Sequence, residues 1–299
     1  MITVLGSINL DLIGKLHHLP KPGETVPGSS FSSAPGGKGA NQALAARRAG
    51  ANVNLYGAVG RDSYAEQALA LLDRDGVDLG TVRHVDAATG IAMIFVDEAG
   101  ENVIGILPGA NGMLTAHDAE VALEAMTPGD VLIVQQEVST EATRKALQLA
   151  NGRGVTSILN TAPFLPGTGE LSRHASIVIA NESEFEELSG APPSEASVRE
   201  WANTRGQRVI VTRGGQGAWG AARNVFWSVD ALKITPIDTV GAGDTFVGYL
   251  AAAIDAKLDI EAAMRRAAVA ASLACLKEGA QPAIPYAGEV DEALNSGSR

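Results

Sequence analysis

Several features are scarce in this 299-residue sequence, and each scarcity excludes a class of protein. There is one cysteine, Cys275, so no disulfide can form within the chain. Acidic residues number 34 against 23 basic ones, and the net charge of −11 argues against a nucleic-acid partner or an acidic membrane surface. The apolar run at 267–276 is too short to span a bilayer, and we expect its cysteine to be a buried thiol. No basic region precedes the first apolar residues, so we expect no signal peptide and a cytoplasmic protein.

The sequence does contain glycine turns that lead into helices. At 235–250 (TPIDTVGAGDTFVGYL), an extended segment reaches the tight turn 241–243, and an apolar helix follows. Such a turn directs free backbone N–H groups at one point, and the helix dipole adds positive charge there. The pattern predicts an anion hole. Asp244, at the helix start, is either a plain cap or a group that takes a proton beside a phosphate.

A second glycine turn opens an alanine-rich helix at 34–50 (APGGKGANQALAARRAG). The two segments, in this order and at this separation, resemble the signature segments of the ribokinase-like (PfkB-type) carbohydrate kinases. Other stretches are similar to the ribokinase branch of that family, namely 6–11, 20–26, 101–106, 108–111, 181–184 and 279–282. The resemblance runs from the first predicted strand almost to the C-terminus.

The order of predicted elements indicates an α/β protein with a mostly parallel sheet sandwiched by helices. After residue 115, strands and helices alternate, as expected for parallel strands joined by crossover helices. The predicted strands are 2–5, 52–59, 131–135, 156–159, 177–180, 208–212 and 219–229, the last broken at 223–224. The predicted helices are 39–50, 63–75, 116–126, 140–151, 183–189, 194–205 and one from 244.

Two β-rich segments interrupt this alternation. The first, about 14–35, suggests short strands at 24–26 and 30–32, and the second, about 89–110, predicts a hairpin. Together they predict a small separate β-sheet within a single domain of residues 1–299. The resemblance implies that this sheet is a lid over a sugar and that two copies pair through it as a homodimer.

The resemblance implies an ATP-dependent kinase that phosphorylates ribose at O5. Phosphoryl transfer needs a positioned hydroxyl, a base and positive potential around the moving group. Asp244 is the candidate base. Backbone N–H groups of Gly241, Ala242 and Gly243 are the candidate donors to the γ-phosphate.

The nucleotide needs a second cradle, because no Walker A motif is present. The stretch 215–220 fits G-x-G-x-x-G, but a strand, not a helix, is predicted after it, which argues against a dinucleotide fold. We interpret the loop as a phosphate cradle formed by Thr212, Gly214, Gly215 and Gly217, with Gly243 opposite. The resemblance adds Asn181 and Glu184 near Mg²⁺, although Asn-x-x-Glu is also a capping box.

The resemblance places the sugar site at the first strand, the second glycine turn and the strand that ends near 135. Its residues are Asn9, Asp11, Gly37, Lys38, Gly39, Asn41 and Glu137. These side chains donate to and accept from hydroxyls, as a sugar requires. From the residues alone, Asn9 and Asp11 fit a polar turn equally well. A lone Glu after a strand, such as Glu137, is more often a solvated loop residue, and only the resemblance singles it out.

A monovalent cation is the last implied ligand. In the resembled family, K⁺ lies beside the anion-hole turn, held by segments that match Asp238, Val240, Ala274, Lys277, Gly279 and Ala283. A serine supplies one ligand at the last position, where this chain has alanine. The other ligands are mostly backbone carbonyls, so we expect K⁺ activation to persist at higher K⁺ concentration.

Other functions fit the same residues. Related kinases act on deoxyribose, fructose or a nucleoside, and a non-catalytic sugar-binding protein could keep the fold. Asp244 argues against the binding protein, because binding requires no base.

Overall fold

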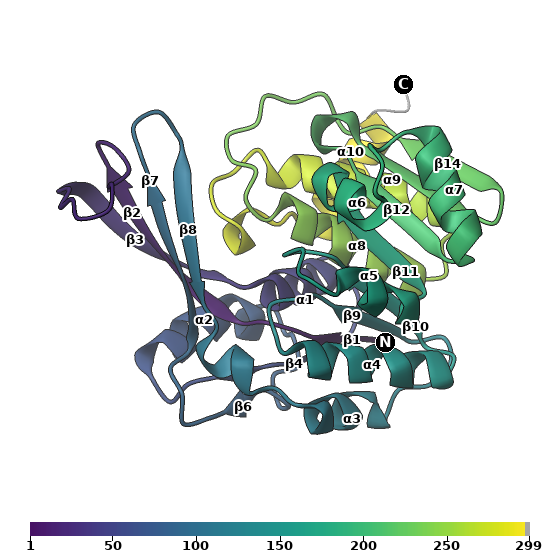
Figure 1. The fold of residues 1–299 in the computed structure, drawn as a ribbon, viewed down its shortest axis with the longest axis horizontal. Coiled ribbons are helices and arrows are strands. Elements are labelled where there is room, and N and C mark those ends of the chain that lie inside the picture. Colours follow the sequence, from purple (N-terminus) through teal and green to yellow (C-terminus); the bar gives the residue numbers. More distant parts are fainter. Residues whose placement is uncertain (297–299) are drawn as a thin grey trace.

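The computed structural model describes residues 1–296. An eight-stranded sheet in the order β14-β13-β12-β11-β10-β9-β1-β4 forms its centre (Figure 1). The strands are β1 (Ile2–Leu5), β4 (Val53–Tyr56), β9 (Val131–Val134), β10 (Thr156–Asn160), β11 (Ile177–Asn181), β12 (Arg208–Thr212), β13 (Ala218–Ala222) and β14 (Val225–Val229). The first six run parallel, and β13 and β14 continue the sheet antiparallel.

Helices cover both faces of this sheet, because alternate residues of its strands are apolar on opposite sides. In β9, Val131 and Ile133 face one hydrophobic cluster while Leu132 and Val134 face the other. One layer holds α1 (Lys38–Arg48), α2 (Ser63–Arg74), α8 (Ala242–Asp255), α9 (Ile260–Ala274) and α10 (Ala287–Ser296). The other holds α3 (Ala116–Glu124), α4 (Thr140–Gly152), α5 (Thr168–Leu171), α6 (Glu182–Ser189) and α7 (Glu195–Arg205). The predicted fold class is confirmed.

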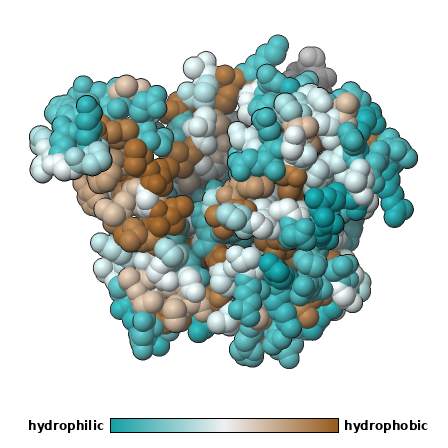
Figure 2. All heavy atoms as spheres, in the orientation of Figure 1, coloured by the Kyte–Doolittle hydropathy of each residue, from teal (hydrophilic) through white to brown (hydrophobic). Residues whose placement is uncertain are grey.

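The predicted small sheet is also present, and it projects from the body at the left of Figure 1. Its order is β3-β2-β7-β8, with β2 (Asn9–Leu16), β3 (Gly28–Gly36), β7 (Gly90–Val96) and β8 (Asn102–Leu107). Figure 2 shows apolar surface over this sheet, beside a hollow that separates it from the body. Exposed large apolar side chains stand on β3, β7 and β8, namely Phe31, Met93, Val103, Ile104, Ile106 and Leu107.

One local prediction was wrong, and one open alternative is excluded. The segment 24–26 is not a strand, because Glu24 closes a turn in which its backbone N–H donates to the Lys21 carbonyl and its carboxylate accepts from the Lys21 N–H. Asn9 and Asp11 do not lie in a turn, since β2 begins at Asn9 and pairs on both sides.

The predicted strand 52–59 is divided at Gly57 into β4 and β5 (Ala58–Val59), which pairs with β6 (Arg83–His84). A Cβ at Gly57 would lie 2.7 Å from Ile8 Cδ1, so the chain turns where another segment crowds it. Short 3-10 helices occupy Gly109–Met113, Ser172–His174, Gly214–Gln216 and Gln281–Ala283. Within 1–296, no helix is long and apolar enough to cross a membrane.

Candidate active site

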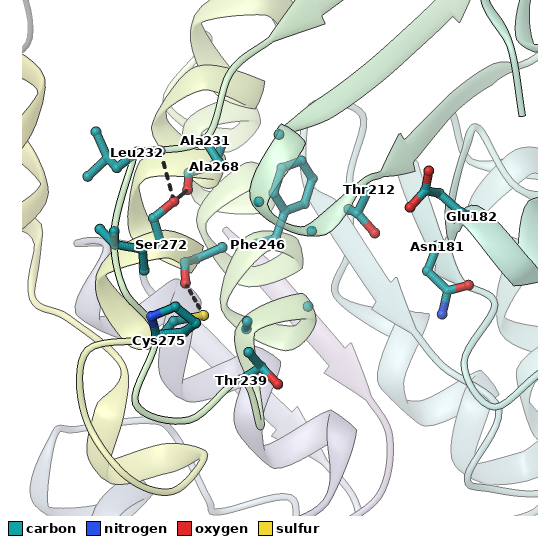
Figure 3. A pocket seen from close by; sticks show the side chains of 18 of the residues that line it. Asn181, Glu182, Thr212, Ala231, Leu232, Thr239, Phe246, Ala268, Ser272 and Cys275 are labelled. Atoms are coloured by element: carbon teal, nitrogen blue, oxygen red, sulfur yellow. Dashed lines mark hydrogen bonds between the residues drawn. The ribbon is translucent and has the colours of Figure 1, made fainter.

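A cavity of about 700 Å³ opens between the ends of β11 and β12 and the helices α8 and α9 (Figure 3). Its polar side is formed by Asn181, Glu182, Thr212 and the glycine loop that follows Thr212. Ala242 and Gly243, the first residues of α8, line it as well. The carboxyl ends of parallel strands and a helix N-terminus thus border one space, an arrangement suited to an anionic ligand.

The wall of the cavity opposite these polar residues is apolar, and the sequence pattern does not predict this wall. Figure 3 shows Phe246, Ala268 and Leu232 on this side, and Cys275 lies at the lower end of the wall. Cys275 is half-buried rather than buried, because it follows the last turn of α9 and its side chain borders the cavity. Burial is the main cause of the raised pKa of its thiol. The apolar residues of α9 have the same spacing as core residues, so pattern alone could not separate them.

Most predicted nucleotide residues border this cavity, namely Asn181, Thr212, Gly214, Gly215, Gly217 and Gly243. Glu184 does not line it. Its Oε2 accepts from Thr161 Oγ1 at 2.8 Å and from the Asn181 N–H at 3.1 Å, and Asn181 Oδ1 accepts from the Glu184 N–H at 2.8 Å. The capping box is therefore confirmed. Glu182, in the same helical turn, lies at the cavity instead.

Asp244 is buried in the first turn of α8, where two amides from α1 hold it. Asn41 Nδ2 donates to Oδ2 at 2.9 Å, and Gln42 Nε2 donates to Oδ1 at 2.8 Å. Gly241 precedes the helix with a φ of 76°, in the left-handed region that favours glycine. The carboxylate and the glycine turn 241–243 are thus adjacent along one helix start.

Further charged groups surround Asp244. The pKa of Asp11 is raised to about 7, mainly by burial and also by the nearby charges of Glu137 and Asp244. The pKa of Lys38 is also raised, chiefly by Asp244, although burial opposes the shift. Glu137 Oε2 accepts from Ser7 Oγ at 2.6 Å and from the Lys38 N–H at 3.0 Å. Three carboxylates and one ammonium therefore form one cluster. Its residues are Asp11 on β2, Lys38 on α1, Asp244 on α8 and Glu137 shortly after β9.

The remaining predicted sugar residues come from the same region. Asn9 Oδ1 accepts from Asn111 Nδ2 at 2.7 Å. Gly37 has a φ of 88°, and a Cβ at Gly39 would lie 2.6 Å from the Ser7 backbone nitrogen, so the second glycine turn packs tightly on the segment after β1. The structure thus brings Asn9, the turn and Glu137 to one end of the sheet.

The segments of the predicted cation site meet beside Gly241. Asp238 Oδ1 accepts from the Val240 N–H at 3.0 Å, and Oδ2 accepts from the Gly279 N–H at 2.8 Å. Ala283 is only 1% exposed and offers no side-chain oxygen. Within the described part of the chain, no group of three or more His, Cys, Asp or Glu could hold a metal ion, so a cation here would need carbonyl oxygens in addition to Asp238.

Comparison with known proteins agrees with this geometry. The model of the pfkB family carbohydrate kinases matches residues 1–287. The chain is 37% identical to a ribokinase of Bacillus subtilis (strain 168) over 98% of this chain and 99% of that protein. It is 32% identical to a deoxyribokinase of Salmonella typhi over 98% of each. The structure of an Arabidopsis thaliana ribokinase complexed with ribose and ATP superposes with a TM-score of 0.88, at 28% identity, and the match covers 98% of each chain.

Proposed function

The chain belongs to the pfkB family of carbohydrate kinases, which transfer phosphate to an alcohol group, and from this premise we propose that it phosphorylates ribose at O5. The observation that carries the proposal is the position of Asp244 between the anion-hole turn and the cluster of Asp11, Lys38 and Glu137. A carboxylate at that junction can reach a sugar hydroxyl and a phosphate at once. The same proposal places the enzyme in the cytoplasm, where ATP is available.

In the proposed reaction, the sugar lies beside β2 and the start of α1, and ATP fills the cavity bordered by α8 and α9. Asp244 takes the O5 proton as the bond from O5 to the γ-phosphorus forms. The bond between the γ-phosphorus and the β–γ bridging oxygen breaks, and ADP leaves. The N–H groups at 241–243 stabilise the charge on the moving phosphoryl group. Closure of the small sheet over the sugar would exclude water that competes as acceptor.

Mg²⁺ fits the polar side of the cavity. Asn181 and Glu182 line that side, and Glu184, whose Oε2 accepts from the Asn181 N–H, belongs to the same helix start. The ion keeps much of its water shell, so few protein oxygens suffice, and when bound it neutralises phosphate charge.

A K⁺ ion fits the loop beside Gly241. Each oxygen of Asp238 accepts one backbone N–H, which leaves lone pairs for a cation, and carbonyls of Val240, Ala274, Lys277 and Gly279 are the other candidate ligands. Water would replace the hydroxyl that Ala283 lacks. A bound cation would supply positive charge next to the anion hole.

We also propose a homodimer through the small sheet. β8 is an edge strand whose six residues are all exposed, and four of its apolar side chains are at least 47% exposed. Exposed apolar edge strands are usually covered by a partner. We propose that the small sheet of a second copy of this chain covers β8.

A substrate panel tests the function. Purified protein with Mg²⁺-ATP is assayed against pentoses, deoxyribose, fructose and nucleosides, with Asp244→Asn as the inactive control. The proposal expects the highest kcat/KM for ribose. Preference for deoxyribose would instead support the second candidate, which the 32% identity to a deoxyribokinase favours. Absence of phosphorylation of every acceptor would contradict both.

A further inference from the structure

Gln42 contacts the candidate base but has no role in the site described so far. Its Nε2 donates to Asp244 Oδ1 at 2.8 Å, while its neighbour Asn41 donates to the other carboxylate oxygen at 2.9 Å. Gln42 is fully buried. It is therefore shielded from solvent, and any effect on a ligand would pass through the groups that it contacts.

Every polar atom of the Gln42 amide has a hydrogen-bond partner. The two hydrogens of Nε2 serve two acceptors, Asp244 Oδ1 at 2.8 Å and Asn160 Oδ1 at 3.0 Å. Its Oε1 accepts from Gln135 Nε2 at 2.7 Å. The reverse orientation would set an amide oxygen against the carboxylate, which can only accept, so Asp244 fixes which end of Gln42 faces it, and Gln135 Nε2 pairs with the oxygen at the other end.

This chain of amides joins four elements. Gln42 is on α1, Asp244 is on α8, Asn160 ends β10 and Gln135 directly follows β9. The two helices pack closely (Figure 1), and a glycine permits it, because a Cβ at Gly248 would lie 2.6 Å from the Gln42 carbonyl oxygen. The distance between amide and carboxylate is thus set by backbone packing as well as by side chains.

We propose that Gln42 is a positioning residue, which fixes the rotation of the Asp244 carboxylate so that one lone pair faces the sugar hydroxyl. Gln135 and Asn160 hold Gln42 in turn. A carboxylate with a donor on each oxygen cannot rotate without losing both bonds, and the geometry of a base contributes directly to rate. The inference rests on the proposed function in taking Asp244 as the base.

The test compares Gln42→Met with Gln136→Met. Gln136 is the matched control: it is 6% exposed, lies next to Gln135 after β9, and bonds to the carbonyls of Thr161 and Pro163 and to Thr168 but not to Asp244. Methionine keeps the volume and removes the donor in both cases. We expect Gln42→Met to lower kcat by roughly 10–100-fold, a part of the ~10²–10⁴-fold that a positioned base supplies, with KM for sugar and ATP little changed. Gln136→Met should lose stability to a similar degree and keep its kcat.

A second variant adds a readout that loss of packing would not produce. Gln42→Glu sets a third oxygen against Asp244 Oδ1 and Asn160 Oδ1, so the pair of carboxyls would hold a proton. The acidic limb of the kcat profile should move to higher pH. Lys38, Asp11, Glu137 and Glu184, the other charged groups of the site, are unchanged in this variant.

The outcomes separate the inference from the function on which it rests. If Asp244→Asn keeps turnover within a few-fold, the assignment of the base is wrong. If Asp244→Asn abolishes turnover while Gln42→Met keeps the kcat of Gln136→Met, the positioning role alone is wrong. If Gln42→Met does not fold, Gln135→Met replaces it with a smaller expected loss of kcat, and an unchanged kcat there overturns the proposal.

Discussion

The α-carbon of Ala280 supports the turn at Gly241: a Cβ placed on Gly241 would lie 2.9 Å from it. The turn 241–243, the proposed anion hole, therefore packs against the loop that carries Gly279 and Ala283. Since Gly241 also has a φ of 76°, both the backbone and its surroundings require glycine.

Gly241→Ala should accordingly misplace the N–H groups of 241–243. We expect kcat to fall by roughly 10²-fold or more, as when oxyanion-hole donors are lost, with sugar affinity nearly unchanged. Steady-state kinetics check this. Gly190→Ala is the control outside the site, because Gly190 also has a positive φ, 75°, directly after a helix, and a Cβ there meets no atom within 4 Å. Equal losses in both variants would show that the contact with Ala280 has no special role.

Asp244→Asn keeps the shape of the side chain and removes its ability to accept a proton. A positioned base is worth ~10²–10⁴-fold, so kcat should fall by at least the lower value. ATP binding, measured by calorimetry, should change little, because the cavity lies on the other side of the turn. Turnover close to that of the wild type would contradict the assignment.

The raised pKa of Asp11, about 7, predicts a pH dependence. Below that pH the carboxyl is protonated and loses charge-assisted acceptance of sugar hydroxyls, so KM for ribose should rise as pH falls from about 8 to about 6. Asp11→Asn should weaken ribose binding and remove this pH dependence. A wild-type KM that is constant across the range would contradict the prediction.

The same shift acts on stability with a defined sign. The folded state holds a proton on Asp11 that the unfolded state has released, so unliganded stability should fall as pH rises from about 4 to about 7. Because the Asp11 carboxyl is not fully buried, Asp11→Asn should raise the free energy of unfolding by only on the order of 1 kcal/mol at about pH 8. Thermal melts of the wild type and the variant, without ligands, measure the difference.

K⁺ should raise activity in Mg²⁺-ATP, and Ala283→Ser should lower the concentration for half activation by restoring a hydroxyl. Thermal shift on adding KCl, with NaCl as control, gives a readout independent of turnover. Asp238→Ala should abolish both effects. Equal activity and equal melting temperature with and without K⁺ would show that the site is absent.

Ile104→Glu should dissociate the proposed homodimer, because it places a charge on the exposed edge strand β8. Val225→Glu is the control, since Val225 is 47% exposed on β14, at the far edge of the large sheet. Light scattering after size exclusion gives the mass of each. A wild-type monomer, or dimers of both variants, would contradict the proposal.

Sequence alone predicted the elements that depend on short-range signals. The Asn181–Glu184 capping box and the glycine before α8 depend on residues that are neighbours in the sequence, and the parallel strands are continuous apolar runs. The lid strand β2 was missed, because its polar residues Asn9 and Asp11 suited a turn as well as a paired strand. Pairing with β3 and β7, distant in sequence, decided between them.

The site shows the same division. The position of Asp244 at a helix start could be predicted from the glycine turn before it, whereas Lys38 was singled out only by the family resemblance. The apolar cavity wall could not, since Ala268 and Ala271 have the spacing of core residues in α9. Gln42 was also missed, because a lone glutamine in a helix carries no signal until its partner on α8, 202 residues later, is in place.

That separation has a consequence for synthesis of the protein. Asn41 and Asp244 are hydrogen-bonded although they are 203 positions apart in the sequence. The part of the site on α1 is therefore synthesised first and cannot be completed until α8 has been synthesised. Loops of this length close late in folding, and domains of this size pass through partly assembled states. Chains that terminate before α8 should therefore have no residual activity, and the enzyme should become active in a single late step as α8 docks against α1.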